Sequence, residues 1–506
     1  MDALVLPVPH LDRGANADER ARFRGVFFRV APAMFIGTLD QAIVAAALPT
    51  IAANLGGFAK IAWLVTAYLL AATVAAPIYG RLGDAFGRKQ ALLTALVLFL
   101  VGSVACALAG TLTILIAARV LQGLGGGGLM TLAQALIGEA VSPKERGRFQ
   151  GWFGAIFALA STLGPLAGGL LSEHFGWRSI FWVNVPLGVV AAAVALRIRS
   201  APGPGGFSPD LRGTPVFIAA TVSLLLFLSL GPARGWSSPA VLLLIAIAVV
   251  GFAVLRPIER RSADPLIPPD LVALPVVWRS AVCVLLFGAL LFAMIVQVPL
   301  LLQIGWGIRA GASGLLLLPL TLAQVASSTV AGARISRTGH PRGPMALGLS
   351  VAALGLVCLT QTAALGPMIT AVACIVVGAG IGTTMPAAQT IVQWAAGSAR
   401  LGTATALLSF TRSIGGVLGA ALASAILLVA LRILAPGISH GLASGASADL
   451  AAGRVSSVEI RTAFRWVFAA LALLAGIAAL VARSISDVDL SVPPLNAKAR
   501  PAPQSI

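Results

Sequence analysis

The chain contains little charge, and acidic residues are the scarcer charged kind. Only 10% of its 506 residues are charged, and 17 of these are acidic against 35 that are basic. Soluble globular proteins carry about 25% charged residues, so the composition excludes a soluble enzyme or binding domain. The net charge of +18 does not indicate a nucleic-acid partner, because the basic residues lie in short loops between apolar stretches rather than in one cluster.

Residues typical of catalytic or metal sites are also sparse. The four cysteines fall in apolar stretches at unrelated spacings and form no CxxC pair, so we interpret them as packing residues rather than disulfide partners or metal ligands. The run Gly123–Gly128 lacks the Lys-Ser or Lys-Thr pair of a phosphate-binding loop, and it predicts close helix packing instead. No nucleophile or acid–base cluster is visible. We therefore expect no enzymatic activity, no metal and no cofactor, with a proton gradient as the energy source.

Long apolar runs dominate what remains. Hydrophobic residues make up 58% of the chain, and the mean hydropathy is +0.95. They are grouped into runs of about 20 residues, the length that crosses roughly 30 Å of hydrocarbon. We predict an all-α membrane protein with fourteen transmembrane helices. Their ranges are 26–49, 60–80, 90–110, 112–138, 148–172, 179–197, 214–232, 238–256, 278–303, 312–333, 343–364, 367–393, 402–431 and 463–482.

The basic residues alternate between successive loops. Most of the 35 Lys and Arg residues fall in the two tails and in every second loop, and Arg29, Arg119 and Arg412 lie inside predicted helices. Loops rich in Lys and Arg stay in the cytoplasm. This pattern predicts a multi-pass protein of the inner (plasma) membrane with both termini cytoplasmic. The first 25 residues lack the features of a signal peptide and predict a loose tail.

Two linkers flank the seventh and eighth helices: the Gly- and Pro-rich segment 198–213, and 257–277, which contains Arg260, Arg261 and a run of prolines. Removing that pair leaves six helices on either side. The outer loop 433–462, rich in Gly, Ala and Ser, is interpreted as a flexible connector. The predicted domains are a tail at 1–25, a six-helix half at 26–197, the linkers and inserted helices at 198–277, a second six-helix half at 278–482 and a tail at 483–506.

The two halves share short sequence patterns. GRLGDAFGRK at Gly80–Lys89 corresponds to GARISRTGHPR at Gly332–Arg342, and GPLAGG at Gly164–Gly169 corresponds to GVLGAA at Gly416–Ala421. Both matches have the same offset along the chain, which indicates an internal duplication. Transporters are often built from such repeats, with the substrate site between them.

Asp40 is the acid that lies deepest in a predicted helix. A carboxylate at that depth costs roughly 2.5–3.5 kcal/mol even on the lenient insertion scale, so a helix that only had to be apolar would not carry it. Arg119, in the fourth helix, is its plausible partner, because a buried Arg is usually paired. We interpret Asp40 as a proton or cation site of a transporter. The alternative is a static salt bridge between the first and fourth helices.

Four segments together resemble a known family. GRLGDAFGRK is similar to the signature loop of the major facilitator superfamily. LDQAIVAAALP from Leu39, ARVLQG from Ala118, and GPLAGG followed by WRSIFWVNVPLG from Trp177 are similar to its fourteen-span drug:proton antiporter family. The resemblance covers nearly the whole chain. It implies the major facilitator fold, with two six-helix halves and two inserted central helices, and an alternating-access multidrug efflux transporter.

The resemblance also implies residue roles. It assigns proton movement to Arg119 and Gln122, acting with Asp40. It makes the loop of Gly80, Asp84, Gly87 and Arg88 a cytoplasmic latch between the halves, for which an orientation signal made of positive charge is the alternative. In the second copy of this loop Ser336 replaces the acid, so only the first copy predicts a charged latch.

GPLAGG is the segment that the resemblance links to antiport. It marks Gly164, Pro165, Gly168 and Gly169 as typical of antiporters rather than importers, and ordinary helix kinking by Pro165 is the alternative. Trp177 is interpreted equally well as an anchor at the membrane interface.

Substrate contacts follow from polar or aromatic residues in the predicted helices, each of which could instead serve packing. The candidates are Trp63, Thr66, Tyr68, Gln297, Gln324, Gln389 and Phe410. Gln297 and Gln324 are preferred, because an unpaired amide is costly in lipid. One carboxylate in an otherwise neutral cavity favours lipophilic cations or neutral amphiphiles.

The sequence therefore predicts a proton-coupled antiporter, a monomer in the lipid bilayer, that exports lipophilic cationic or neutral amphiphilic compounds. Whether a periplasmic adaptor takes part stays open. A dedicated exporter of one endogenous metabolite or antibiotic shares every motif. A proton-coupled importer and a non-transporting membrane sensor are the more distant alternatives; the sensor would need a soluble signalling domain.

Overall fold

The structure is a bundle of long helices. This computed structural model describes residues 13–56, 60–198, 210–262, 264–362, 366–434, 457–490 and 492, and every regular element in those ranges is helical. Thirteen of the helices are long and apolar enough to cross a membrane, and the shorter apolar segment Ser179–Ala195 adds one more. These fourteen segments match the fourteen predicted helices and confirm the predicted fold class.

The elements divide as predicted into two halves and a central pair. The first half contains α1 (Arg13–Leu55), α2 (Trp63–Phe86), α3 (Arg88–Leu108), α4 (Leu112–Ala140), α5 (Pro143–His174), α6 (Ser179–Trp182) and α7 (Asn184–Ala195). The central pair is α8 (Gly213–Arg234) and α9 (Pro239–Arg261), followed by the short α10 (Pro269–Val272). The second half contains α11 (Pro275–Leu300), the π-helix η2 (Leu301–Gly305), α12 (Ala310–Thr338), α13 (Arg342–Thr362), α14 (Pro367–Ile381), α15 (Thr384–Ala396), the 3₁₀ turn η3 (Ser398–Arg400), α16 (Leu401–Leu434) and α18 (Ser457–Ser484).

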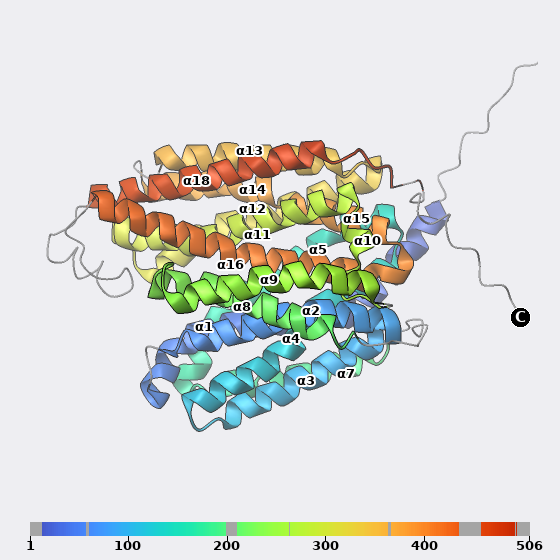
Figure 1. The fold of residues 1–506 in the computed structure, drawn as a ribbon, viewed down its shortest axis with the longest axis horizontal. Coiled ribbons are helices and arrows are strands. Elements are labelled where there is room, and N and C mark those ends of the chain that lie inside the picture. Colours follow the sequence, from blue (N-terminus) through green and yellow to red (C-terminus); the bar gives the residue numbers. More distant parts are fainter. Residues whose placement is uncertain are drawn as a thin grey trace, which may run out of the picture.

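The halves lie side by side. In Figure 1 helices α1 to α4 and α7, blue to cyan, lie below the second half, yellow to red, while α5 is seen among the helices of the second half, and the green pair α8 and α9 covers the front of the junction. Contacts between the halves run mainly from α5 to α12 and from α2 to α16, while α8 contacts both α2 and α16. The inserted pair therefore packs on both halves rather than standing apart.

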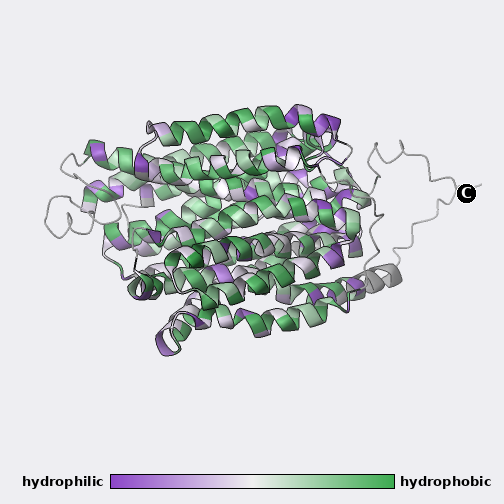
Figure 2. Cartoon of the chain, turned by 60° about the horizontal axis from the view of Figure 1, so that its bottom comes forward, coloured by the Kyte–Doolittle hydropathy of each residue, from purple (hydrophilic) through white to green (hydrophobic). Residues whose placement is uncertain are grey.

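Apolar side chains cover most of the bundle. Figure 2 shows hydrophobic residues along the length of the helices and hydrophilic residues mainly towards their ends. Large apolar side chains such as Leu354 and Leu480 are exposed, whereas Phe99 and Phe464 are buried between helices. An outer surface of apolar side chains suits the hydrocarbon of a bilayer. The helices also satisfy their backbone polar groups internally, as a membrane requires.

Glycines let α4 approach its neighbours closely, as the run Gly123–Gly128 predicts. A Cβ atom on Gly123 would lie 2.5 Å from the Tyr68 carbonyl oxygen on α2, and one on Gly125 would lie 2.3 Å from the Phe99 nitrogen on α3. Neither distance leaves room for a side chain. The close-packing interpretation of this run is confirmed.

Several boundaries differ from the predictions. Helix α1 begins at Arg13, so part of the segment predicted as a loose tail is helical, while residues 1–12 lie outside the described residues. Most of the linker 198–213 and of the loop 433–462 also lies outside them. In the second linker, Leu266 and Leu271 are buried, which a simple connecting segment would not require.

The four cysteines are free. Cys106, Cys283 and Cys374 are buried, in agreement with a packing role, but Cys358 is exposed on α13. The packing interpretation is therefore wrong for Cys358, because its position on α13 faces away from the bundle.

Candidate functional site

A buried polar network surrounds Asp40 in the middle of α1. The Asp40 side chain is 0% exposed. Its Oδ2 accepts a hydrogen bond from Arg119 Nη1 at 2.6 Å, and its Oδ1 accepts from Gln122 Nε2 at 2.9 Å and from Asn184 Nδ2 at 2.7 Å. The predicted ion pair between Asp40 and Arg119 is confirmed.

Ser103 and Tyr68 complete this network. The Ser103 hydroxyl oxygen accepts from both Gln122 and Asn184 at 3.0 Å and donates to the Phe181 carbonyl at 3.2 Å. The Arg119 guanidinium lies over the Tyr68 ring, 4.2 Å from its centroid. It is held further by bonds from Nε to the Leu64 carbonyl at 3.2 Å and from Nη1 to Gln122 Oε1 at 2.7 Å.

The hydrogen bonds of this network require Asp40 as an acceptor. Both Asp40 oxygens accept bonds from N–H donors, so the network is complete only when the group is a carboxylate. If either carboxylate oxygen were protonated, its O–H group would point at the N–H donors of Arg119, Gln122 or Asn184, and a hydrogen bond would be lost. It would also leave Arg119 as an unpaired buried cation, a situation that is strongly unfavourable. Proton binding would therefore force Asp40 and its neighbours to rearrange.

Sequence reasoning missed Asn184 and Ser103. Asn184 lies within the predicted sixth helix, and its sequence context alone predicts no role for it. The sixth helix is in fact broken between α6 and α7, and Asn184 opens α7 with its amide directed at Asp40. The available signal was a lone Asn inside an otherwise apolar run. Trp177, expected at the interface, is buried against Phe181.

Asp84 joins the halves at one end of the bundle, here called the latch end, formed by Asp84, Arg88 and the start of α16. Its Oδ1 accepts from the Gly402 N–H at 2.8 Å, and its Oδ2 accepts from the Thr403 N–H at 2.7 Å and the Thr403 hydroxyl at 2.8 Å. A carboxylate on the free N–H groups of a helix start is favourable both as a hydrogen-bond acceptor and as a charge near the positive end of the helix dipole.

The rest of the loop supports Asp84. Arg88 binds Asp84 at 2.9 Å, Glu139 of α4 at 2.8 Å and the Ser398 carbonyl of the other half at 3.0 Å. Gly87 has φ of 101° between α2 and α3, a conformation that favours glycine. A Cβ on Gly80 would lie 2.7 Å from the Gly402 carbonyl oxygen. Gly80, Asp84 and Arg88 thus contact the second half directly, and Gly87 allows the turn that positions them.

The second copy of the loop makes a related contact with the donor and acceptor exchanged. The Ser336 hydroxyl donates to Glu145 Oε1. Glu145 is the third residue of α5, and Thr403 is the third residue of α16. One contact therefore has the acid on the loop and the hydroxyl on the helix, and the other has the reverse. As predicted, Ser336 itself carries no charge. The charge in this second contact is the carboxylate of Glu145, which accepts the hydrogen bond.

We expect Ser336→Ala to weaken this second contact. The hydroxyl donates to a charged group, and such bonds contribute about 1.5–3 kcal/mol, so the state with the latch end closed should be less populated and transport should slow several-fold. The measurement is the initial transport rate per molecule in membranes. Thr360→Val is the control, because the exposed Thr360 hydroxyl bonds to its own helix. Equal rates for both variants would contradict the expectation.

Two further ion pairs attach the second linker to both halves at the latch end. Arg81 of α2 pairs with Asp264, and Arg400 of η3 pairs with Asp270 at 2.6 Å. The linker is therefore fixed to the first half at one point and to the second half at another.

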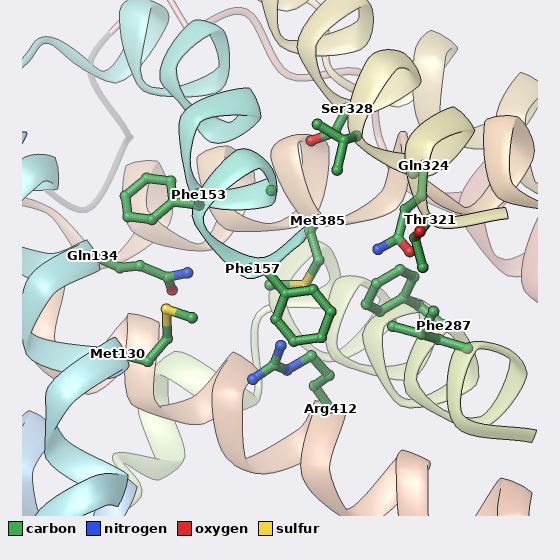
Figure 3. Close-up of a pocket in the computed structure, with 14 residues that line it drawn as sticks. Met130, Gln134, Phe153, Phe157, Phe287, Thr321, Gln324, Ser328, Met385 and Arg412 are labelled. Carbon is green, nitrogen blue, oxygen red and sulfur yellow. The ribbon is translucent and has the colours of Figure 1, made fainter. Parts of the chain in front are cut away.

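A pocket lies between the halves. Figure 3 shows side chains from both halves around it. Its lining residues are Met130, Gln134, Phe153, Gly154, Phe157, Phe287, Leu291, Thr321, Gln324, Val325, Ser328, Gly382, Met385 and Arg412. The lining is mostly apolar and aromatic with a few neutral polar groups, which is typical of small-molecule sites. Among the described residues that line it, Arg412 is the charged one.

Of the seven predicted substrate contacts, Gln324 lines this pocket. Gln389 lies directly behind it, where its Nε2 donates to Gln134 Oε1 at 3.3 Å. Gln297 is buried and donates to Ser424 at 3.3 Å. The other four lie elsewhere in the fold. Tyr68 belongs to the Asp40 network, Phe410 packs on Phe217, and Trp63 and Thr66 lie at the start of α2.

GPLAGG presses α5 onto α1 beside Asp40. A Cβ on Gly164 would lie 2.3 Å from Ala42 Cβ, and one on Gly168 would lie 2.6 Å from the Ile43 carbonyl oxygen. Pro165 lies inside α5. Gly169 has no atom within 4 Å of such a Cβ, so the four motif residues are not equivalent.

This difference gives a matched pair of variants. We expect Gly168→Val to force α5 away from α1, lowering the stability of the protein by about 1–3 kcal/mol or more and reducing transport. Gly169→Val, one residue away, should change neither appreciably. Thermal unfolding of the purified protein and transport by membranes check this. A similar loss for both variants would contradict the packing explanation.

Helix α4 connects the three sites. It carries Arg119 and Gln122 in the Asp40 network, Met130 and Gln134 in the pocket, and Glu139 beside the latch. At 1.5 Å per residue, Arg119 and Glu139 lie roughly 30 Å apart along this one helix, with the pocket residues between them. Helix α5 also connects the three sites. It packs on α1 at Gly168 beside the Asp40 network, lines the pocket with Phe153 and Phe157, and carries Glu145 of the second latch contact in its first turn.

The described residues thus form a bundle of membrane-length helices in two halves, with a pocket between the halves and contacts across them at one end. The sequence profile of the Major Facilitator Superfamily matches residues 30–420, and the chain belongs to that superfamily.

Known relatives support this assignment. An MFS-type transporter of Mycobacterium tuberculosis is 36% identical over 405 residues, which is 78% of this chain but only 58% of that protein. The multidrug transporter protein MdtP of Bacillus subtilis is 34% identical over 404 residues, covering 78% of this chain and 73% of MdtP. The efflux pump dotC of Dothistroma septosporum is 33% identical over 402 residues, covering 77% and 69%.

Solved structures agree on the fold. The proton:xylose symporter XylE has a TM-score of 0.61 at 12% identity, covering 93% of this chain and 98% of XylE. The human organic anion transporter MFSD10 has a TM-score of 0.57 at 15% identity, covering 91% and 99%. At such identities the likeness concerns the fold alone.

Proposed function

We propose that this protein is a proton-coupled antiporter that exports amphiphilic small molecules across the plasma membrane by alternating access. The observation that carries the proposal is the buried network in which Asp40 is bound by Arg119, Gln122 and Asn184. An ionisable residue inside an apolar bundle marks a functional site by default, and this carboxylate accepts bonds from three donor side chains. The relatives named multidrug transporter and efflux pump support export as the direction.

In this proposal the latch end faces the cytoplasm, together with both termini. The structure then corresponds to the state closed to the cytoplasm, with Asp84 on α16 and Ser336 against Glu145. A proton from outside binds Asp40 and releases Arg119. The rearrangement passes along α4 to the pocket and the latch, so that the proton and the substrate need not share one cavity. Each proton entering supplies about 2.3 kcal/mol per 100 mV.

The pocket supports a broad rather than narrow choice of substrate. Met130 and Met385 are flexible side chains that fill irregular space, and Phe153, Phe157 and Phe287 offer flat apolar surfaces. Neutral amphiphiles fit this lining. Cations, which the sequence also predicts, would meet Arg412. The second candidate is a dedicated exporter of one endogenous metabolite or antibiotic, which would use the same coupling.

The test is a panel of amphiphilic dyes and antibiotics in a host lacking its own efflux pumps. Expression should lower the accumulation of several unrelated compounds, and a protonophore should abolish that effect. Protection against a single compound would favour the dedicated exporter. Export that persists with the proton gradient collapsed would overturn the proposal.

A further inference from the structure

Arg412 is a membrane-embedded cation without a partner in the described part of the chain. It lies inside α16 and lines the pocket between the halves. No hydrogen bond or ion pair joins its guanidinium to a described residue, and no Asp or Glu is among the residues that line the pocket. Arg119, which is 1% exposed, has Asp40, whereas Arg412 is half-buried at the pocket wall. The contrast between the two needs an explanation, because buried charges are normally paired.

The position of Arg412 is fixed by its backbone. A Cβ on Gly288 of α11 would lie 2.3 Å from the Arg412 carbonyl oxygen, and one on Gly415 would lie 2.0 Å from the Leu285 carbonyl oxygen. Helix α16 is thus pressed against α11 at this level. Figure 3 shows the guanidinium rising from α16 towards Phe157, with Gln134 and Met130 to one side and Phe287 to the other.

The chemistry of this arrangement suits an anion. A guanidinium offers several N–H donors in a planar fork that matches a carboxylate or sulfonate, and bonds between two charged groups are the stronger ones. Gln134 and Gln324 can donate further bonds, while the aromatic and Met side chains contact an apolar body. A cationic substrate would instead be repelled by Arg412.

We propose that Arg412 is a specificity residue that pairs with the acidic group of anionic amphiphiles, which are this transporter's preferred substrate class. The proposal deepens the export function proposed above and rests on it. It also has a consequence for energetics. Export of one anion against import of one proton moves two charges inward, whereas export of one cation against one proton moves none. Each charge contributes about fifty-fold in accumulation per 100 mV, so membrane potential should drive anion export strongly.

The test uses three dansyl probes that share one aromatic body and end in a carboxylate, a carboxamide or a trimethylammonium group. Binding to the purified protein is measured by dansyl fluorescence, and transport by everted membrane vesicles is measured with the potential clamped. We expect wild-type protein to bind the carboxylate at least tenfold more tightly than the trimethylammonium probe. Imposing the potential should increase carboxylate transport and leave trimethylammonium transport nearly unchanged.

Variants then assign the preference to Arg412. Arg412→Gln should reduce carboxylate binding at least tenfold while changing carboxamide binding less than threefold, and Arg412→Lys should keep most of the preference. Arg432→Gln is the matched control, because it removes an exposed positive charge from the last turn of the same helix.

Each outcome decides the matter. Equal losses for all three probes in Arg412→Gln would mean that Arg412 is structural and would overturn the proposal. Tighter binding of the trimethylammonium probe by wild-type protein would overturn it too. If charge preference appears in binding but no probe is moved by the proton gradient, the export function fails while the assignment of Arg412 stands.

Discussion

Replacing Asp40 by Asn should uncouple transport from protons. The variant cannot release or bind a proton at this position, and it leaves Arg119 without its counter-charge. Breaking a buried pair on one side costs about 3–5 kcal/mol, so the single variant should also be less stable. Proton release on substrate addition should fall to background in reconstituted vesicles.

A second variant separates coupling from folding. Asp40→Asn with Arg119→Gln removes both charges and should recover much of the stability while remaining uncoupled. Asp487→Asn is the control, since Asp487 is exposed and pairs with His340 at 3.4 Å. If the double variant is stable and still moves protons with substrate, Asp40 is only a structural member of the bundle, the alternative that the sequence leaves open.

Replacing Asp84 by Asn should slow the transport cycle by tenfold or more while leaving the protein in the membrane. Asn keeps one acceptor oxygen but presents an NH₂ group to the N–H donors at the start of α16. Hydrogen bonds to charged groups contribute about 1.5–3 kcal/mol each, and the helix dipole adds about 0.3–1 kcal/mol. The measurement is the initial export rate normalised to the amount of protein in the membrane.

The second copy of the loop suggests a rescue. Asp84→Ser combined with Thr403→Glu reproduces the arrangement of Ser336 and Glu145, with the hydroxyl on the loop and the acid on the helix. This double variant should export faster than Asp84→Ser alone. No slowing in Asp84→Asn would refute the latch, and no rescue would show that the two contacts are not interchangeable.

Much of the fold follows from the sequence because the bilayer imposes one length on every apolar run. The helix count could be predicted on that basis, and the repeat follows from two sequence matches at the same offset. Breaks within helices were not predicted: α6 and α7 are separated at Val183, and α14 and α15 at Gly382 and Thr383, where the hydrophobic run as a whole continues on both sides of the break. Composition does not distinguish a continuous helix from a broken one of equal length.

The site was predictable in part for a similar reason. The ion pair of Asp40 and Arg119 follows from the cost of burying either charge alone. Asn184 and Ser103 carry no charge, so their role depended on which helix faces they occupy. Arg412 carried the same signal as Arg119, a cation inside a span, but had no acid to suggest a partner. Tyr68 and Phe410 are aromatic residues on buried faces, and the sequence does not tell packing from substrate contact.

The most direct test of the account is proton movement in vesicles that contain purified protein and a trapped pH dye. Substrate added to wild-type protein should drive protons in the opposite direction to substrate, with a fixed ratio of the two. The variant with Asp40→Asn and Arg119→Gln, folded to the same extent, should show no such movement. Substrate transport without any proton movement in wild-type protein, or unchanged proton movement in the double variant, would contradict the account.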